Sequence, residues 1–150
     1  MIDRERLNAF LALESLLFLG ASRGGRKFGN LLLRALRERG TRIYPVHPEA
    51  ESLEGLPCLP SLADLPAGVE GAVLVLKPGD VVEVLPALAA AGIRRVWVQQ
   101  GGESTGAEAR ALELDIKLIQ GQCLLMFLPE AAWIHRFHRK VSAWMGRVPA

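Results

Sequence analysis

The sequence has few aromatic residues, few cysteines and almost no excess of charge. Aromatic residues make up 6% of the 150 residues and hydrophobic residues 50%, so the core must be mostly aliphatic. A chain this apolar can offset the entropy of ordering itself, which excludes an intrinsically disordered protein. The 18 basic and 16 acidic residues leave a net charge of +2, which argues against general binding to nucleic acids.

The sequence also lacks a predicted membrane span and a secretory signal. Its longest uncharged stretch, residues 118–129, is polar in places and shorter than the about 20 residues that a spanning helix needs. The first six residues carry charges of both signs, unlike a signal peptide. Cys58 and Cys123 fit neither a C-x-x-C motif nor zinc-site spacing, so we expect reduced, buried thiols rather than a disulfide or redox pair. These features favour a cytoplasmic protein.

Buried aliphatic runs alternate with amphipathic segments along the chain. Strands are predicted at residues 16–19, 42–46, 72–76, 96–98 and 116–119. Helices are predicted at residues 3–13, 27–39, 80–91, 105–114 and 130–144. Residues 50–66, with three prolines, are predicted as a loop; Pro86 should delay or kink its helix, and Thr105 with Glu108 forms a capping-box pattern.

This alternation predicts an α/β fold with a Rossmann-like, doubly wound parallel sheet. We expect five strands in the order 3-2-1-4-5, with helices on both faces and a C-terminal helix. No linker, repeat or low-complexity segment divides the sequence. Residues 1–150 are therefore predicted to form a single domain.

The segment after the first predicted strand is rich in glycine and basic residues. Residues 20–29 read Gly-Ala-Ser-Arg-Gly-Gly-Arg-Lys-Phe-Gly. Glycines allow a tight turn and close approach to a ligand, and the following helix offers its N-terminus to a phosphate. The segment therefore favours an anionic, phosphorylated ligand. The alternative is an ordinary strand-to-helix turn whose arginines face water.

Two well-known phosphate-binding motifs do not fit this segment. Gly20 is followed by glycines at 24, 25 and 29, which breaks the dinucleotide pattern G-x-G-x-x-G. The second strand ends at Val46-His47-Pro48 without the carboxylate that would hold the ribose of NAD. No G-K-[ST] of a Walker loop occurs. These details argue against NAD, whereas the arginines would tolerate NADP.

Several motifs at the predicted strand ends together resemble one known family. They are Gly20-Ala21-Ser22, Tyr44-Pro45-Val46-His47-Pro48, Gly55-Leu56-Pro57-Cys58, Pro60-Ser61-Leu62-Ala63-Asp64-Leu65-Pro66, Lys77-Pro78 and Trp97-Val98-Gln99-Gln100-Gly101. The chain, over roughly residues 13–123, resembles the small stand-alone CoA-binding proteins. These are similar to the CoA-binding domain of the succinyl-CoA synthetase α subunit but lack its phosphohistidine segment and nucleotide-binding partner domain.

The resemblance implies coenzyme A or an acyl-CoA as the cofactor and assigns a role to each matching position. The residues implied at the pyrophosphate and pantetheine are Gly20, Ala21, Ser22, Arg23 and Arg26, and those implied beside the adenosine are Val46, His47, Pro48, Leu76, Lys77 and Pro78. Gln99 and Gly101 would lie further along the ligand. The residues themselves leave open whether His47 contacts a phosphate or simply forms a turn, and whether Lys77 is only a solvated lysine.

No catalytic motif accompanies this candidate site. The three histidines lie at 47, 135 and 138, no G-x-S-x-G elbow occurs, and no carboxylate pair falls near the expected ligand face. We therefore expect a non-catalytic CoA-binding module. The alternatives are an NADP-binding enzyme or redox sensor, and the CoA-binding subunit of a separate acyl-CoA ligase.

The predicted C-terminal helix is more typical of an interface than of a metal site. Trp133, Phe137 and Trp144 lie on one apolar stripe, and such residues anchor protein interfaces. His135 and His138 are spaced as metal ligands can be, but no third ligand accompanies them. A homo-oligomer or protein partner at residues 130–144 is therefore expected, and no metal, nucleic acid or membrane.

Overall fold

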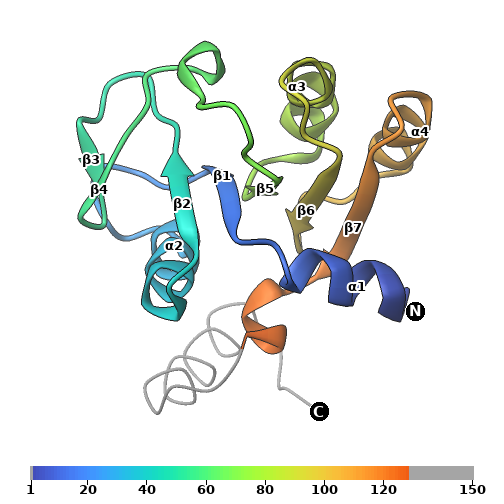
Figure 1. The fold of residues 1–150 in the computed structure, drawn as a ribbon, viewed down its shortest axis with the longest axis horizontal. Helices are drawn as coiled ribbons and strands as arrows, with labels where there is room; N and C mark the ends of the chain where they lie inside the picture. The colour runs from blue at the N-terminus through green and yellow to red at the C-terminus, as the bar shows by residue number, and fades with distance from the viewer. Residues whose placement is uncertain (1, 129–150) are drawn as a thin grey trace.

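The computed structural model describes residues 2–128, which form a parallel sheet between two layers of helices (Figure 1). The sheet contains β1 (Ser15–Leu19), β2 (Arg42–Pro45), β5 (Gly71–Leu74), β6 (Arg95–Gln99) and β7 (Lys117–Gln122). The helices are α1 (Arg4–Leu11), α2 (Phe28–Arg39), α3 (Pro78–Ala90) and α4 (Thr105–Glu113), with short 3-10 helices η1 (Leu62–Asp64) and η2 (Leu124–Phe127). The predicted helix at residues 130–144 lies outside the described residues.

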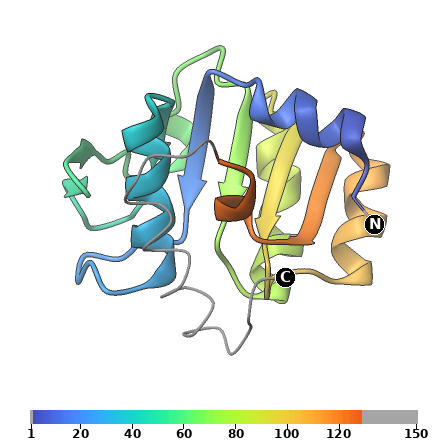
Figure 2. The same cartoon turned by 90° about the horizontal axis from the view of Figure 1, so that it is seen from below.

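The two faces of the sheet are buried by different helices, as the doubly wound prediction requires. Leu16 and Phe18 of β1 pack in a cluster with α1, α2 and η2, whereas Leu17 packs in a second cluster with α3 and α4. Figure 2 shows α1, α2 and η2 together on one face of the strands. This arrangement follows from the alternation of side chains along a strand that is covered on both sides. The Rossmann-like α/β architecture predicted from the sequence is confirmed.

The order of the strands differs from the prediction. The observed order is β2-β1-β5-β6-β7, which is 2-1-3-4-5 when only the strands of this sheet are numbered, so the predicted order 3-2-1-4-5 is wrong. The third strand, Gly71–Leu74, pairs with β1 and β6, and all four of its residues are buried. Pro45 explains why β2 is the edge strand: its carbonyl accepts a hydrogen bond from Leu59 on the outer side, where its own nitrogen has no hydrogen to donate.

Three local features also differ from the prediction. The segment predicted as a loop at residues 50–66 contains the antiparallel hairpin of β3 (Ser52–Leu53) and β4 (Leu56–Pro57), as well as η1. Helix α3 begins at Pro78 and continues through Pro86 to Ala90, so Pro86 does not delay its start. Ser104, rather than Thr105, is the N-cap of α4, and its hydroxyl accepts from the backbone N–H of Ala107 at 3.0 Å.

The outer edge of β7 is partly covered by α1. The Arg6 guanidinium donates to the backbone carbonyl of Leu118 at 3.0 Å and so satisfies one polar group of this edge strand. Covering an edge in this way opposes pairing with a strand of another chain. None of the helices between residues 2 and 128 combines the length and the apolar character needed to cross a bilayer.

Candidate functional site

The chain leaves adjacent strands β1 and β5 in opposite directions, and this opens a crevice at their carboxyl ends. The two strands pair up to Leu19 and Leu74, and the N–H of Val75 still donates to the Leu19 carbonyl at 2.8 Å. The chain then turns from β1 into α2 on one face and from β5 into α3 on the other. Such a switch point is where open α/β sheets bind their ligands.

A cavity of about 460 Å³ occupies this crevice. It is lined by Gly20, Ala21, Lys27, Phe28, Gly29, Val75, Leu76, Lys77 and Asp80. Four of the residues predicted from the sequence, Gly20, Ala21, Leu76 and Lys77, are thereby brought together from two strand ends. Val75 directly follows β5, and the other lining residues lie in the first turns of α2 and α3 or directly before α2.

Glycine is required where the two turns and α2 pack against each other. Gly20 has φ of +117°, and a Cβ there would lie 2.7 Å from the Cβ of Val75. A Cβ on Gly29 would overlap the carbonyl group of Gly20, coming within 2.8 Å of its carbonyl carbon. The backbone of α2 therefore lies directly against the end of β1, which brings the helix N-terminus to the cavity.

The two helices that begin at the cavity lack side-chain caps. The N-cap residues are Lys27 for α2 and Lys77 for α3, and neither makes a capping hydrogen bond through its side chain. By contrast, α1 is capped by Asp3 and α4 by Ser104. A helix N-terminus attracts anions, and a lysine there adds to its positive charge instead of neutralising it. Both helix ends at the cavity are therefore suited to phosphate groups.

Three basic side chains near the cavity are exposed and unpaired. Arg26, Lys27 and Lys77 form no ion pair or side-chain hydrogen bond with any residue from 2 to 128. Arg23 differs, because its guanidinium lies 3.8 Å from the carboxylate of Glu49, a pair exposed to solvent. Asp80 in the first turn of α3 is the only acidic residue that the described part of the chain contributes to the lining. The balance at the cavity is thus positive.

The predicted residues after β2 form a turn beside this region without lining the cavity itself. The Nδ1 atom of His47 accepts hydrogen bonds from the backbone N–H groups of Glu49 and Ala50, both at 3.0 Å. These contacts support the turn interpretation of His47. The side chains of Val46 and Leu76 pack against the same hydrophobic cluster, so they lie on the same face of the sheet. Pro48 follows in the turn and is exposed.

The other predicted residues occupy separate positions around the strand ends. Gln99 ends β6 and is 2% exposed. Its Oε1 accepts from the backbone N–H of Leu124 at 3.0 Å, and its buried Nε2 has no hydrogen-bond partner among residues 2–128. The N–H of Gly101 donates to the side chain of Glu103 at 2.7 Å. Pro78 is the first residue of α3. Ser22 is held by Asn30 of α2, a contact that the sequence analysis did not identify.

Neither cysteine lines the cavity, and the described residues contain no cluster of metal ligands. Cys58 and Cys123 are free thiols, and burial raises the pKa of the Cys58 thiol, which lowers its thiolate fraction. Cys123 is buried as expected, whereas Cys58 is only partly buried. Among residues 2–128, no three side chains of His, Cys, Asp or Glu are grouped as a metal site would need.

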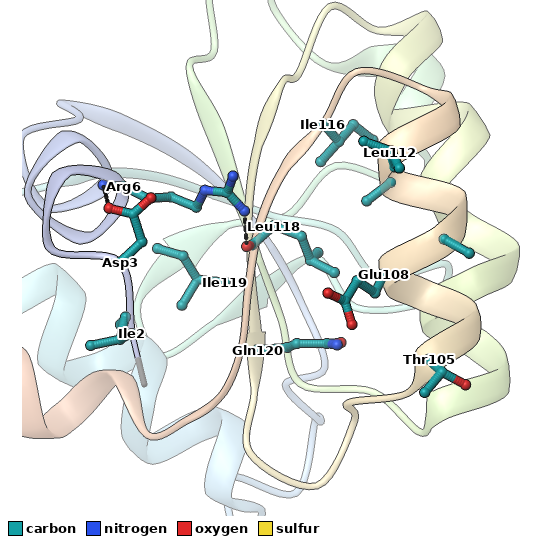
Figure 3. A pocket seen from close by; sticks show the side chains of 12 residues that line it. Ile2, Asp3, Arg6, Thr105, Glu108, Leu112, Ile116, Leu118, Ile119 and Gln120 are labelled. Carbon is teal, nitrogen blue, oxygen red and sulfur yellow. Dashed lines mark hydrogen bonds between the residues drawn. The ribbon is translucent and has the colours of Figure 1, made fainter.

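A larger hollow of about 700 Å³ lies at the β7 edge of the sheet, between α1 and α4 (Figure 3). Its lining includes Arg6 and Glu108 but none of the residues predicted to bind the ligand. Its walls are the outer surfaces of two capped helices, and Arg6 already donates to the strand edge. The smaller cavity, where two strand ends and two uncapped helices meet, is therefore the candidate functional site.

Comparison with known proteins shows which proteins the chain resembles. A family model described as a CoA-binding domain matches residues 14–129. Acetate–CoA ligase (ADP-forming) I of Archaeoglobus fulgidus is 28% identical over 140 residues, which span 87% of this chain and 20% of the ligase. Acetate–CoA ligase (ADP-forming) II of the same organism is 33% identical over 100 residues, 65% of this chain and 15% of the ligase. The chain therefore spans a fifth or less of these two curated relatives.

Solved structures show the same fold in short and long proteins. A Thermus thermophilus protein described as cell-free ID.343 superposes with a TM-score of 0.73 and 27% identity, covering 91% of this chain and 98% of that protein. The dinucleotide-forming acetyl-coenzyme A synthetase 1 of Candidatus Korarchaeum cryptofilum, in its apo form, superposes with a TM-score of 0.63 and 30% identity. That match covers 78% of this chain and 27% of the synthetase.

Proposed function

Because the chain belongs to the CoA-binding domain family, we propose that it binds coenzyme A or an acyl-CoA in the cavity between the ends of β1 and β5, without catalysing a reaction itself. The family match confirms the resemblance identified from the sequence. The binding mode and the absence of catalysis are the parts of the proposal that need testing.

One observation carries the proposed binding mode: two uncapped helix N-termini, each with a lysine at its N-cap, meet at one cavity. Coenzyme A carries a pyrophosphate and a 3′-phosphate. Phosphates bound here would accept hydrogen bonds from the free backbone N–H groups of both helix ends. They would also offset the charges of Lys27 and Lys77. Loss of an unfavourable charge arrangement in the free protein would thus add to the affinity.

The remaining predicted residues are proposed to contact the rest of the ligand. Val46, His47 and Pro48, beside the end of β2, would lie along the adenosine, and Gly101 would lie further along the ligand. Gln99 would lie toward the pantetheine, and its Nε2 is a buried amide donor that an acyl carbonyl could satisfy. An unsatisfied buried donor is costly, so such a contact would be favourable.

The lack of catalysis is supported by the chemistry of the lining. The part of the lining that residues 2–128 provide contains one carboxylate, Asp80, two lysines and otherwise apolar or glycine residues, and no nucleophile paired with a base. The relatives named as ligases are five or more times longer than the matched region. A ligase subunit therefore remains the second candidate function, in which a partner would supply the catalytic groups.

Binding is tested by thermal unfolding and calorimetry of the full chain with CoA, acetyl-CoA, NAD and NADP. Ligand at a hundred times its Kd stabilises the fold by about 2.7 kcal/mol, roughly a 5–11 °C rise in Tm for a domain of this size. We expect this rise with CoA or acetyl-CoA and little change with NAD. A rise with NADP and none with either CoA species would contradict the proposal.

The charge contribution is tested in the same experiment with two lysine variants. Lys77→Ala should weaken CoA binding and reduce its salt dependence, because an unpaired cation at the cavity is lost. Lys117→Ala removes an equally exposed lysine at the start of β7 and should leave the affinity unchanged. Equal affinities for both variants and the wild type would exclude Lys77 from the site.

A further inference from the structure

We propose that Glu54 and Asn30 are positioning residues that hold the segment 20–27, here called the glycine-rich loop, in its ligand-binding shape. Neither residue lines the cavity, and they come from the β3–β4 hairpin and from α2. The inference rests on the proposed function because its readout is CoA affinity. It adds that a residue of the β3–β4 hairpin, outside the cavity, helps to determine the conformation of the glycine-rich loop.

Asn30 clamps the loop at Ser22 through both ends of its amide. Its Oδ1 accepts from the Ser22 backbone N–H at 2.9 Å and from the Ser22 hydroxyl at 3.2 Å. Its Nδ2 donates to the Ser22 carbonyl at 2.8 Å. Asn30 is 1% exposed, so water cannot replace these hydrogen bonds. Both backbone polar groups of Ser22 are therefore fixed before any ligand arrives.

Glu54 holds Asn30 in this orientation. One of its carboxylate oxygens accepts from Asn30 Nδ2 at 3.1 Å, and the other accepts from Arg34 Nε at 3.0 Å. Because the carboxylate can only accept, it forces the Asn30 NH₂ group toward itself and the Ser22 carbonyl, leaving Oδ1 for the Ser22 N–H. The same carboxylate lies beside Gly25, 3.6 Å from where a Cβ would stand.

The backbone at Glu54 is unusual in a way that fits this role. Glu54 has φ of +49°, a left-handed conformation that non-glycine residues rarely adopt. Arg37 of α2 donates to the Glu54 carbonyl at 2.6 Å and keeps the hairpin against the helix. The side chain of Glu54 is only 15% exposed. Such backbone geometry persists where the surrounding contacts determine it, often at functional sites.

These contacts order the glycine-rich loop before the ligand binds. A preorganised loop loses less conformational entropy on binding, so the affinity is higher than for a mobile loop with the same contacts. Arg26 and Lys27 lie on this loop, and their approach to a phosphate depends on its shape. Loss of the Glu54 carboxylate should therefore weaken CoA binding although no ligand contact is removed.

The test compares Glu54→Gln with Glu51→Gln, which removes the same charge from an exposed residue before the same hairpin. For Glu54→Gln we expect Kd for CoA to rise about five- to tenfold, and the apo amides of residues 20–27 to exchange hydrogen faster. Glu51→Gln should change neither quantity. If Glu54→Gln does not fold at the assay temperature, Glu54→Asn replaces it. Asparagine also removes the carboxylate that reaches Asn30, and it tolerates positive φ.

A double-mutant cycle shows whether the effect passes through the loop. If it does, Glu54→Gln should raise Kd less in an Arg26→Ala background than in the wild type. A purely structural role would lower Tm but leave Kd and loop exchange unchanged, and that result would overturn the inference. Failure of the wild type to bind CoA would instead overturn the proposed function. Hydrogen exchange of the loop amides in the apo protein would still test whether Glu54 and Asn30 order the loop.

Discussion

At the scale of single residues, the site depends on two glycines that let the end of β1 and the start of α2 touch. Gly20 provides positive φ and contacts Val75, and Gly29 lies against the Gly20 carbonyl. Gly79 occupies the equivalent second position of α3, yet a Cβ there would meet nothing within 4 Å. Packing therefore requires glycine at the second position of α2 but not at the second position of α3.

Gly29→Ala should destabilise the protein although alanine is the better helix former. The overlap of the new Cβ with Gly20 costs about 1–3 kcal/mol, which outweighs the about 0.5–1 kcal/mol gained from helix propensity. Gly79→Ala is the matched control and should be neutral or slightly stabilising. Urea unfolding of both variants measures the difference. Equal stability of the two would show that the close approach of α2 to β1 carries no cost.

The residues differ in how well the sequence reveals them. Gly20 and Lys77 could be predicted because they directly follow buried strands, where the fold class places ligands. Asn30 and Glu54 could not, because their contacts join positions 8 and 24 residues apart and no motif spacing marks them. The role of His47 in a turn was one of two sequence interpretations, and its two backbone hydrogen bonds support it.

At the scale of elements, the four α-helices that the structure describes fall into two groups by their N-cap residues. Those that start away from the cavity have Asp3 or Ser104 at the N-cap, and those that start at the cavity have lysine. A side-chain cap and a bound phosphate use the same backbone N–H groups. Stability of the free protein and affinity for an anion are therefore in competition at α2 and α3.

Lys27→Ser should make this competition visible. A serine cap should stabilise the apo protein by about 0.5–1 kcal/mol, while CoA affinity falls severalfold because a charge is lost and the N–H groups are occupied. Ser104→Ala on α4 is the reverse control, with about 1 kcal/mol of stability lost and affinity unchanged. Denaturant unfolding and calorimetry supply both quantities. A more stable Lys27→Ser variant with unchanged affinity would exclude the N-terminus of α2 from phosphate binding.

The sheet shows where element-level prediction stopped. Aliphatic runs and helical periodicity located all five strands and the helices within residues 2–128 to within a few residues. The predicted strand order placed the second strand inside the sheet and is wrong, although Pro45, which has no N–H to donate, is a signal for an edge position. The β3–β4 hairpin was missed because its strands have only two residues each.

At the scale of the whole molecule, the described residues form a crevice at the carboxyl ends of β1 and β5, between the two helical layers. The described chain has a larger hollow over β7, but that hollow lies beside capped helices and carries none of the predicted ligand residues (Figure 3). The two hollows also differ in charge. Arg26, Lys27 and Lys77, which are exposed and form no ion pair within residues 2–128, lie near the smaller cavity. The small net charge of the chain conceals this local concentration.

The central claim is that CoA binds at the ends of β1 and β5, and amide chemical-shift mapping of the full chain tests it most directly. On titration with CoA, the largest shifts should fall on the glycine-rich loop, Gly29 and residues 76–80, with smaller ones after β2. The amides around the hollow between α1, α4 and β7 should stay unchanged and serve as the internal control. Saturable shifts confined to that hollow, with none at residues 20–29, would contradict the account.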